Sequence, residues 1–298
     1  MFQNYTGEFA ALATAIFWTI TALAFESASM KVGSLSVNII RLVIGFIFLS
    51  LFAWIRRGLF LPVDATTDNW TWLVVSGLVG FVFGDLFLFK AYTIIGSRFS
   101  MLIMTLVPPI TALFGWIILR ERLSLFNFIG MFLTFSGITL AIFSRGANDK
   151  ISLKLAPKGV LFAFGGALGQ AGGLVLSKYG MGDYDAFAST QIRIIAGIAG
   201  FILLVSLMKR WKKVGSAINN RHAMTGITIG SFFGPFLGVS FSLIAIKFTQ
   251  TGIASTIMSL VPVLIIPPAY LLFRQKVTLI EIIGTMISVG GVTLFFIK

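Results

Sequence analysis

The sequence predicts an all-α integral membrane protein of about ten transmembrane helices, arranged as two inverted five-helix repeats. The composition, the spacing of apolar runs and an internal repeat carry this prediction. Hydrophobic residues make up 57% of the 298 residues and charged residues only 11%, with a mean hydropathy of +0.97. A soluble domain carries roughly a quarter charged residues. Since one span needs about 20 apolar residues, the chain has room for little besides its spans.

Breaks at charged residues and at Gly, Pro and Asp clusters divide the chain into expected spans. These spans lie near residues 7–30, 34–55, 70–92, 98–119, 125–143, 158–178, 186–208, 223–247, 252–273 and 279–297. The polar segment 144–157, which contains Asp149 and Lys150, is the natural linker between halves. We therefore expect a first repeat over residues 1–147 and a second over residues 148–298.

The repeat is visible in the residues themselves. Residues 100–143 align without a gap on residues 254–297 at an offset of 154. The aligned pairs include Pro108 with Pro262, Arg120 with Arg274, Gly130 with Gly284 and Gly137 with Gly291. The same offset extends back to Gly80 with Gly234 and Gly84 with Gly238. At an offset of 152, Arg41 meets Arg193. An odd number of spans in each unit makes the second unit enter from the opposite face, which is the architecture of many secondary transporters.

The duplicated layout is accompanied by a family motif. The segment Leu119-Arg120-Glu121-Arg122-Leu123-Ser124, followed by Gly130 and Ser136-Gly137-Ile138, resembles the turn between the fourth and fifth spans of EamA-type transporters in the drug/metabolite transporter superfamily. The second copy, Phe273-Arg274-Gln275-Lys276-Val277-Thr278, departs from the family by carrying Gln where Glu is typical. The resemblance covers about the whole chain and implies a carrier without naming its cargo.

Two prolines at equivalent positions, Pro108 and Pro262, are expected to break the fourth and ninth spans. Each removes the amide that would bond to the carbonyl four residues earlier, and a neighbouring hydroxyl could re-satisfy that carbonyl. The carbonyls and hydroxyls concerned are those of Met104 and Thr105 in the first half and Met258 and Ser259 in the second. Matched broken helices point to a substrate site near the membrane midplane, with simple kinks as the alternative.

Charged residues inside spans are the next candidates, because an ionised side chain at the bilayer centre costs at least about 2.5–3.5 kcal/mol unless it faces protein or water. Asp85 is the best candidate for a charge that faces a cavity, whereas Lys90 lies near a span end, where it can reach water. Arg41 and Arg193 either pair across helices or bind an anionic substrate group. The polar residues near these two arginines are Asn38 and Gln191.

Further positions inside spans could line a cavity that mixes apolar walls with a few hydrogen-bonding groups. They are Trp18, Thr21, Tyr92, Gln170 and Ser240. Glu26 and Lys178 are repeat-equivalent and could pair as a gate. For Glu121 we expect a loop ion pair with Arg120 or Arg122, with gating or ion coupling as the alternative.

We expect no catalytic residue, cofactor or metal site, and hence no enzyme. The sequence has no Cys and a single histidine, His222, and it lacks the G-x-x-x-x-G-K-[ST] motif of ATP-driven proteins. Its net charge of +13 comes mostly from residues between apolar runs, which indicates membrane anchoring rather than nucleic-acid binding. The expected partners are membrane lipid, a small-molecule substrate and a coupling ion, and two halves on one chain permit a monomer.

The leading hypothesis is a secondary transporter that moves a small organic metabolite, such as an amino acid or related compound, by alternating access, with export as one direction. The alternative is a passive pore or a membrane scaffold on the same fold. We expect a multi-pass protein of a prokaryotic plasma (inner) membrane. The family resemblance implies cytoplasmic termini, whereas the positive-inside rule favours the reverse because of Lys209, Arg210, Lys212, Lys213 and Arg221.

Overall fold

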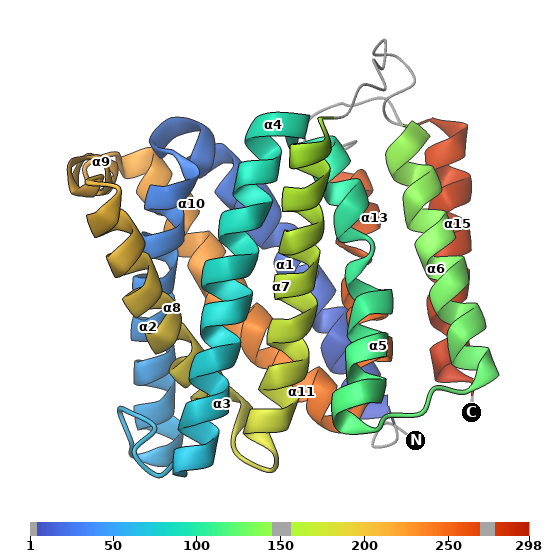
Figure 1. Cartoon of the computed structure of the whole chain (residues 1–298), viewed down its shortest axis with the longest axis horizontal. Helices are drawn as coiled ribbons and strands as arrows, with labels where there is room; N and C mark the ends of the chain where they lie inside the picture. The colour runs from blue at the N-terminus through green and yellow to red at the C-terminus, as the bar shows by residue number, and fades with distance from the viewer. Residues whose placement is uncertain (1–4, 145–155, 269–277, 298) are drawn as a thin grey trace.

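The computed structural model describes residues 5–144, 156–268 and 278–297. The chain forms a bundle of helices standing side by side, with both termini at the same end (Figure 1). Within the described ranges no residue lies in a β-strand. Eight helical stretches there are long and apolar enough to cross a bilayer, and Val107–Leu119 and Leu125–Ala141 are shorter apolar helices. The all-helical prediction is therefore confirmed.

The first half ends its helices at residues that the sequence marks. Gly33 and Gly58 follow α1 and α2 with φ angles of 81° and 70°, a backbone conformation that glycine adopts without strain. Thr66 caps α3 through a reciprocal hydrogen-bonded box with Asn69. The order of elements is α1 (Thr6–Val32), α2 (Ser34–Arg57), α3 (Thr67–Gly77), the π-helical segment η2 (Leu78–Gly84), α4 (Asp85–Met104), α5 (Val107–Leu119) and α6 (Leu125–Ser144).

The second half repeats this pattern. Its elements are α7 (Pro157–Met181), α8 (Ala186–Leu207), α9 (Trp211–Ile218), α10 (Arg221–Ser231), the π-helical segment η3 (Phe232–Gly238), α11 (Val239–Phe248), α12 (Thr251–Met258), α13 (Val261–Leu264), α15 (Leu279–Thr293) and the 3-10 turn η4 (Leu294–Phe296). The bounds of α10 and η3, and the start of α11, lie 154 residues after those of α3, η2 and α4. The repeat seen in the sequence therefore extends to irregular backbone.

The third and fourth expected spans are divided differently in the structure. Helix α4 runs without interruption through the expected break at residues 93–97, and the chain leaves helical conformation only at Thr105 and Leu106. The matching break between α12 and α13 is at Ser259 and Leu260. The reason is that isolated Gly, Ser and Arg residues are tolerated inside a helix, whereas a proline amide cannot donate. The helix breaks expected from Pro108 and Pro262 are thus present.

Each half packs its first helix onto the other half. Helix α1 lies against α10, η3 and α11, and α7 lies against α3, η2 and α4. Glycines allow this close approach. A Cβ added at Gly169 would lie 2.6 Å from the Cα of Gly84, and one at Gly173 would lie 2.7 Å from the Cα of Gly80. Close approach of small residues is a main source of helix association in membranes, and here it joins the two halves.

Helices α6 and α15, the last long helix of each half, pack against each other at one edge of the bundle (Figure 1). Their close contacts are reciprocal in the repeat. They join Gly130 with Gly291, Gly137 with Gly284, and the Thr134 hydroxyl with the Ser288 carbonyl at 3.4 Å. Thr134 and Ser288 are themselves 154 residues apart, so the two helices meet at equivalent positions.

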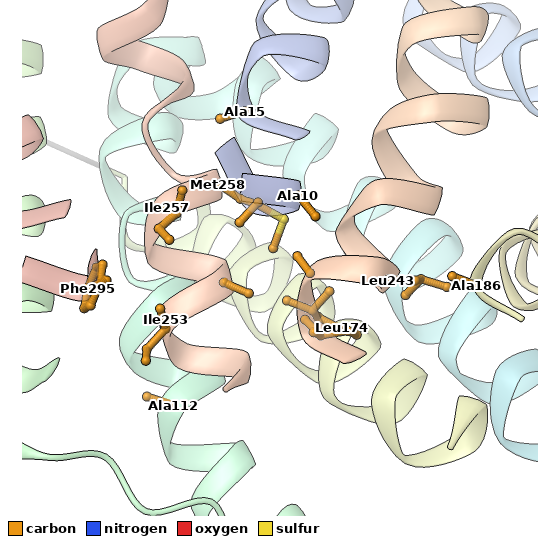
Figure 2. Packing of buried hydrophobic residues seen from close by; sticks show 14 of the residues in the cluster. Ala10, Ala15, Ala112, Leu174, Ala186, Leu243, Ile253, Ile257, Met258 and Phe295 are labelled. Atoms are coloured by element: carbon orange, nitrogen blue, oxygen red, sulfur yellow. The ribbon is translucent and has the colours of Figure 1, made fainter. Parts of the chain in front are cut away.

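Small and aliphatic side chains fill the interior between α1 and α12 (Figure 2). Ala10 and Ala15 of α1 are buried, as are Ile253, Ile257 and Met258 of α12. Because lipid chains are as apolar as these side chains, the gain here comes from close packing rather than from removal of surface from water. The second broken helix is thereby held against the first helix of the chain.

Candidate functional site

A cavity of about 350 Å³ lies between the two halves. Residues of α1, α2, α4, α5, α7 and α8 line it together with residues of η2, η3, α11, α12 and α13. Both helix breaks border it, since its wall includes Met104 and Thr105 of the first break and Met258, Ser259 and Pro262 of the second. A cavity of this size suits a small organic molecule.

The Ser259 hydroxyl is used at its break, but not on the carbonyl that was expected. It donates to the carbonyl of Thr256 at 2.7 Å rather than to that of Met258. The hydroxyl is thus committed to the last turn of α12, which it helps to close.

Asp85 and Arg41 form an ion pair in the wall of the cavity. Asp85 is the first residue of α4, directly after η2, and is 6% exposed. A π-helical turn carries an extra residue, so it changes which face the following helix presents, and such turns occur often at functional sites. Each partner lowers the cost of holding the other inside the membrane.

Arg193 of α8 lies in the same wall without a charged partner. It is 5% exposed, and its guanidinium carbon lies 4.9 Å from the centroid of the Phe81 ring. It makes no hydrogen bond or ion pair within the described part of the chain, and its buried Nε lacks an acceptor there. Asp85 is the one acidic residue among the described lining residues, and it is already paired. Among the described residues, the face of the Phe81 ring is what offsets the charge of Arg193.

Trp18 and Gln170 line the cavity from α1 and α7 at repeat-equivalent positions. Each lies beside a glycine of the opposite half, Trp18 beside Gly238 and Gln170 beside Gly84. A Cβ added at Gly238 would lie 2.6 Å from the Trp18 ring. Gly238 thus makes room for the Trp18 ring, and Gly84 lets the backbone of α7 approach closely at Gln170.

Three other expected residues, Gln191, Asn38 and Ser240, are not among the described residues of this wall. Gln191 donates to the Ser50 hydroxyl and to the Phe60 carbonyl, both at 2.8 Å, and so joins α8 to α2 and the loop after it. Asn38 is buried in α2, with its side-chain nitrogen unpaired. The side chain of Tyr92 lies outside the described residues.

A second cavity of about 830 Å³ lies between α5 and α6. Its mostly apolar wall includes Pro108, Leu113, Trp116, Phe128 and Phe132. Thr105 and Ser259 line both cavities. The two spaces therefore meet at the helix breaks, and Pro108, expected in the first cavity, faces the second.

A polar network joins the two halves at the end of the bundle where the termini lie. The Glu121 carboxylate accepts a hydrogen bond from Lys178 Nζ at 2.8 Å and from the amide and hydroxyl of Thr251 at 2.8 and 2.7 Å. Lys178 also donates to the carbonyl of Thr249 at 2.7 Å, and the Thr249 hydroxyl donates to Glu8 at 3.0 Å. The network links α1, the turn after α5, α7 and the turn before α12.

This network corrects two expectations. Glu121 pairs with Lys178 instead of Arg120 or Arg122, because Arg120 ends α5 in a left-handed conformation with φ of 58° and the chain turns there. Lys178 was expected to pair with Glu26, whose side chain lies outside the described residues. Through Thr249, Lys178 lies near Glu8, at the opposite end of α1 from Glu26. Along this helix Glu8 and Glu26 are separated by roughly 27 Å, at about 1.5 Å per residue.

These features define a class of protein, a duplicated multi-pass helical membrane protein with a charged cavity between its halves. The model of the EamA-like transporter family matches residues 5–143 and again residues 157–297. The chain belongs to the EamA-like transporter family. It is accordingly a membrane transporter, a class distinct from enzymes.

Two further comparisons agree with this assignment. The uncharacterized transporter YyaM of Bacillus subtilis (strain 168) is 27% identical over 225 residues, which cover 74% of this chain and 70% of YyaM. A protein solved by crystallography shares the fold with a TM-score of 0.74 and 18% identity, over 98% of this chain and 96% of that chain. The second similarity speaks for the fold alone.

Proposed function

We propose that the chain is a secondary carrier that moves a small organic metabolite, such as an amino acid or a related compound, by alternating access. The observation that carries this proposal is the cavity between the halves, which holds Asp85, Arg41 and Arg193 beside two matched helix breaks. Charges inside membrane helices are costly, and in transport proteins they mark substrate or ion pathways. A purely structural scaffold gives no reason for three of them around one cavity.

The carrier has ten spans in two inverted repeats in this proposal, with the shorter helices Val107–Leu119 and Leu125–Ala141 crossing the membrane as well. The first repeat covers residues 1–147 and the second residues 148–298. The reciprocal contacts of α6 and α15 support the inversion, because a two-fold axis in the membrane plane brings equivalent residues of two helices together. The bacterial relative supports a prokaryotic plasma membrane.

Alternating access requires one side of the cavity to close while the other opens. The network around Glu121 and Lys178 is suited to hold the closed side at the end where the termini lie. It joins elements of both halves through hydrogen bonds to Thr249 and Thr251, which can form and break without changing the helices themselves. The second cavity, between α5 and α6, leaves room for these helices to move.

The proposal is tested first by binding and then by exchange. A thermal-stability screen of the purified protein against amino acids, nucleosides, sugars and cationic drugs identifies a ligand, since binding to the folded state raises its apparent stability. The ligand class is then used in proteoliposomes, where unlabelled cargo inside accelerates the entry of labelled cargo outside. We expect saturable flux with such acceleration, and imposed proton or sodium gradients reveal a coupling ion.

The matched variants are Asp85→Asn, in the cavity, and Asp64→Asn, at an exposed ion pair with Arg57. Both make the same chemical change. We expect Asp85→Asn to abolish exchange in a protein that still folds, and Asp64→Asn to retain it. Non-saturating flux without acceleration would instead identify a passive pore, and equal activity of the two variants would remove the cavity from the mechanism.

A further inference from the structure

We infer that Arg193 binds the carboxylate group of the transported molecule, so that the cargo is a small carboxylate, either a monoanion or a zwitterion. The inference rests on the proposed carrier function and names the chemical class of its cargo. Neither the family nor the relatives specify that class. Three observations carry it, namely the charge balance of the cavity, a difference between the two repeats and the chemistry of the guanidinium.

The cavity carries one positive charge that no described residue neutralises. Asp85 and Arg41 balance each other, whereas Arg193 is buried beside Phe81 without an acceptor. A guanidinium stays protonated in proteins, so it cannot relieve the imbalance by losing its proton. A buried cation of this kind is stabilised when an anion enters the cavity, whose volume of about 350 Å³ suits a small molecule.

The two repeats differ at the position that would supply the missing anion. Asp85 begins α4 directly after η2, and Val239 begins α11 directly after η3, 154 residues later. Arg193 is in turn the equivalent of Arg41. Both Val239 and Asp85 line the cavity. Arg41 therefore has an acidic partner, and Arg193 has a valine where the repeat would place one.

A carboxylate group on the ligand has the charge and the shape to serve as the missing partner of Arg193. The guanidinium presents parallel N–H donors in a planar fork that fits two carboxylate oxygens, and its central carbon lies 4.9 Å from the centroid of the Phe81 ring. A single positive charge is balanced by one carboxylate, whereas a phosphate ester brings up to about two negative charges. The rest of the wall, with Leu88, Leu174 and Met258, accommodates a small organic body.

The first test compares acids with their amides. The purified full-length protein in lipid nanodiscs is titrated with α-amino acids and simple monocarboxylates, and with the carboxamide of each, while thermal stability is followed. We expect each acid that binds to do so at least about tenfold more tightly than its amide, since a charged hydrogen-bonded pair is lost in the amide. Equal binding of acid and amide, or equal stabilisation by chloride alone, would overturn the inference.

The second test supplies the missing acid from the protein. Val239→Asp places a carboxylate at the cavity-lining position that the repeat pairs with Arg193, and Val239→Asn is its size-matched neutral comparison. We expect Val239→Asp to bind the acids at least about tenfold more weakly than Val239→Asn, because the internal carboxylate competes with the ligand. Arg193→Gln provides a second route to the same loss, which keeps the test decisive if Val239→Asp does not fold.

The outcomes separate this inference from the carrier function. If the protein binds acids more tightly than amides, and more weakly in Val239→Asp than in Val239→Asn, but exchanges no cargo across vesicle membranes, the carrier function is wrong and the carboxylate site stands. Exchange of a cargo without a carboxylate, equally fast in Val239→Asp and Val239→Asn, keeps the carrier and overturns the site. Equal acid affinity in the folded Arg193→Gln and unsubstituted proteins also overturns it.

Discussion

Replacing Gly291 by alanine is expected to force α6 and α15 apart. An added Cβ would lie 2.6 Å from the amide nitrogen and the hydroxyl of Thr134, and 2.8 Å from the carbonyl oxygen of Gly130. Ordinary van der Waals contact begins near 3.4 Å, so the helices have to separate by roughly 0.8 Å or bend, with a loss of dispersion contacts along the seam. We expect the free energy of unfolding to fall by about 1–3 kcal/mol.

The neighbouring glycine provides the control, because a Cβ added at Gly290 meets nothing within 4 Å. Gly290→Ala is expected to leave stability unchanged or to raise it by up to about 1 kcal/mol, the helix propensity gained over glycine. Both variants are unfolded reversibly by adding sodium dodecyl sulfate to mixed micelles, with helix content followed by circular dichroism. Equal stability of Gly291→Ala and Gly290→Ala would refute the packing argument.

Further substitutions test the site and its closure. Asp85→Asn leaves Arg41 charged and unpaired, so we expect it to lower the free energy of unfolding by about 3–5 kcal/mol; the double variant Arg41→Gln/Asp85→Asn is expected to recover part of that loss in the same titration, and no recovery would mean that the pair is not coupled. Lys178→Met removes the ion pair with Glu121 and is expected to admit water from the end where the termini lie. Since the chain has no Cys, a single Ser255→Cys in the cavity wall can report the entry of water as faster labelling by a polar thiol reagent in proteoliposomes. If Lys178→Met left the labelling rate unchanged with reagent added on either side of the membrane, the role of the network in closing the cavity would be contradicted. Burial raises the pKa of the Tyr184 hydroxyl, which donates to Asp64 at 2.8 Å, to about 12 from a usual 10.0. Because the folded state then holds this proton more tightly than the unfolded state, its contribution to stability is present below pH 10 and is lost as pH rises toward 12; the ultraviolet difference between the protein and Tyr184→Phe measures the titration, and phenolate signal from Tyr184 below pH 10 would contradict it.

The sequence predicted those parts of the site in which the residue type alone carries a large energetic cost, either in a helix or in lipid. Pro108 and Pro262 have no amide hydrogen to donate to a helix, so the helix breaks follow from residue type alone. Asp85, Arg41 and Arg193 are too costly to face lipid, so their place inside the protein also follows. Asp85, Arg41, Arg193 and Pro262 line the first cavity, in agreement with both arguments, and Pro108 lines the second.

Other features depend on tertiary structure and have no local signal. The two π-helical turns share glycines at equivalent positions, Gly80 with Gly234 and Gly84 with Gly238, whereas Pro235 of η3 has Phe81 as its equivalent in η2. Glycines also occur inside the regular helix α7, so glycine by itself does not mark a π-helical turn. Glu121 and Lys178 are 57 residues apart, and their pairing depends on how the chain turns after α5. Helix geometry alone argues against a place for Gln191 in the same cavity wall as Arg193, because Gln191 precedes Arg193 by two residues and so points about 200° away from it.

The crossed packing of the two halves bears on how such a site can arise. A chain with a single repeat could cover its first helix only by exchanging it with an identical second chain, and every substitution would then occur on both sides of the cavity. Joining the copies end to end frees each position to diverge from its twin, as position 85 has from position 239 and position 81 from position 235. Two identical subunits necessarily place the same side chain on both sides of the cavity. The fused chain can present a balanced pair on one side and a lone guanidinium on the other, and with them a polarity for its ligand.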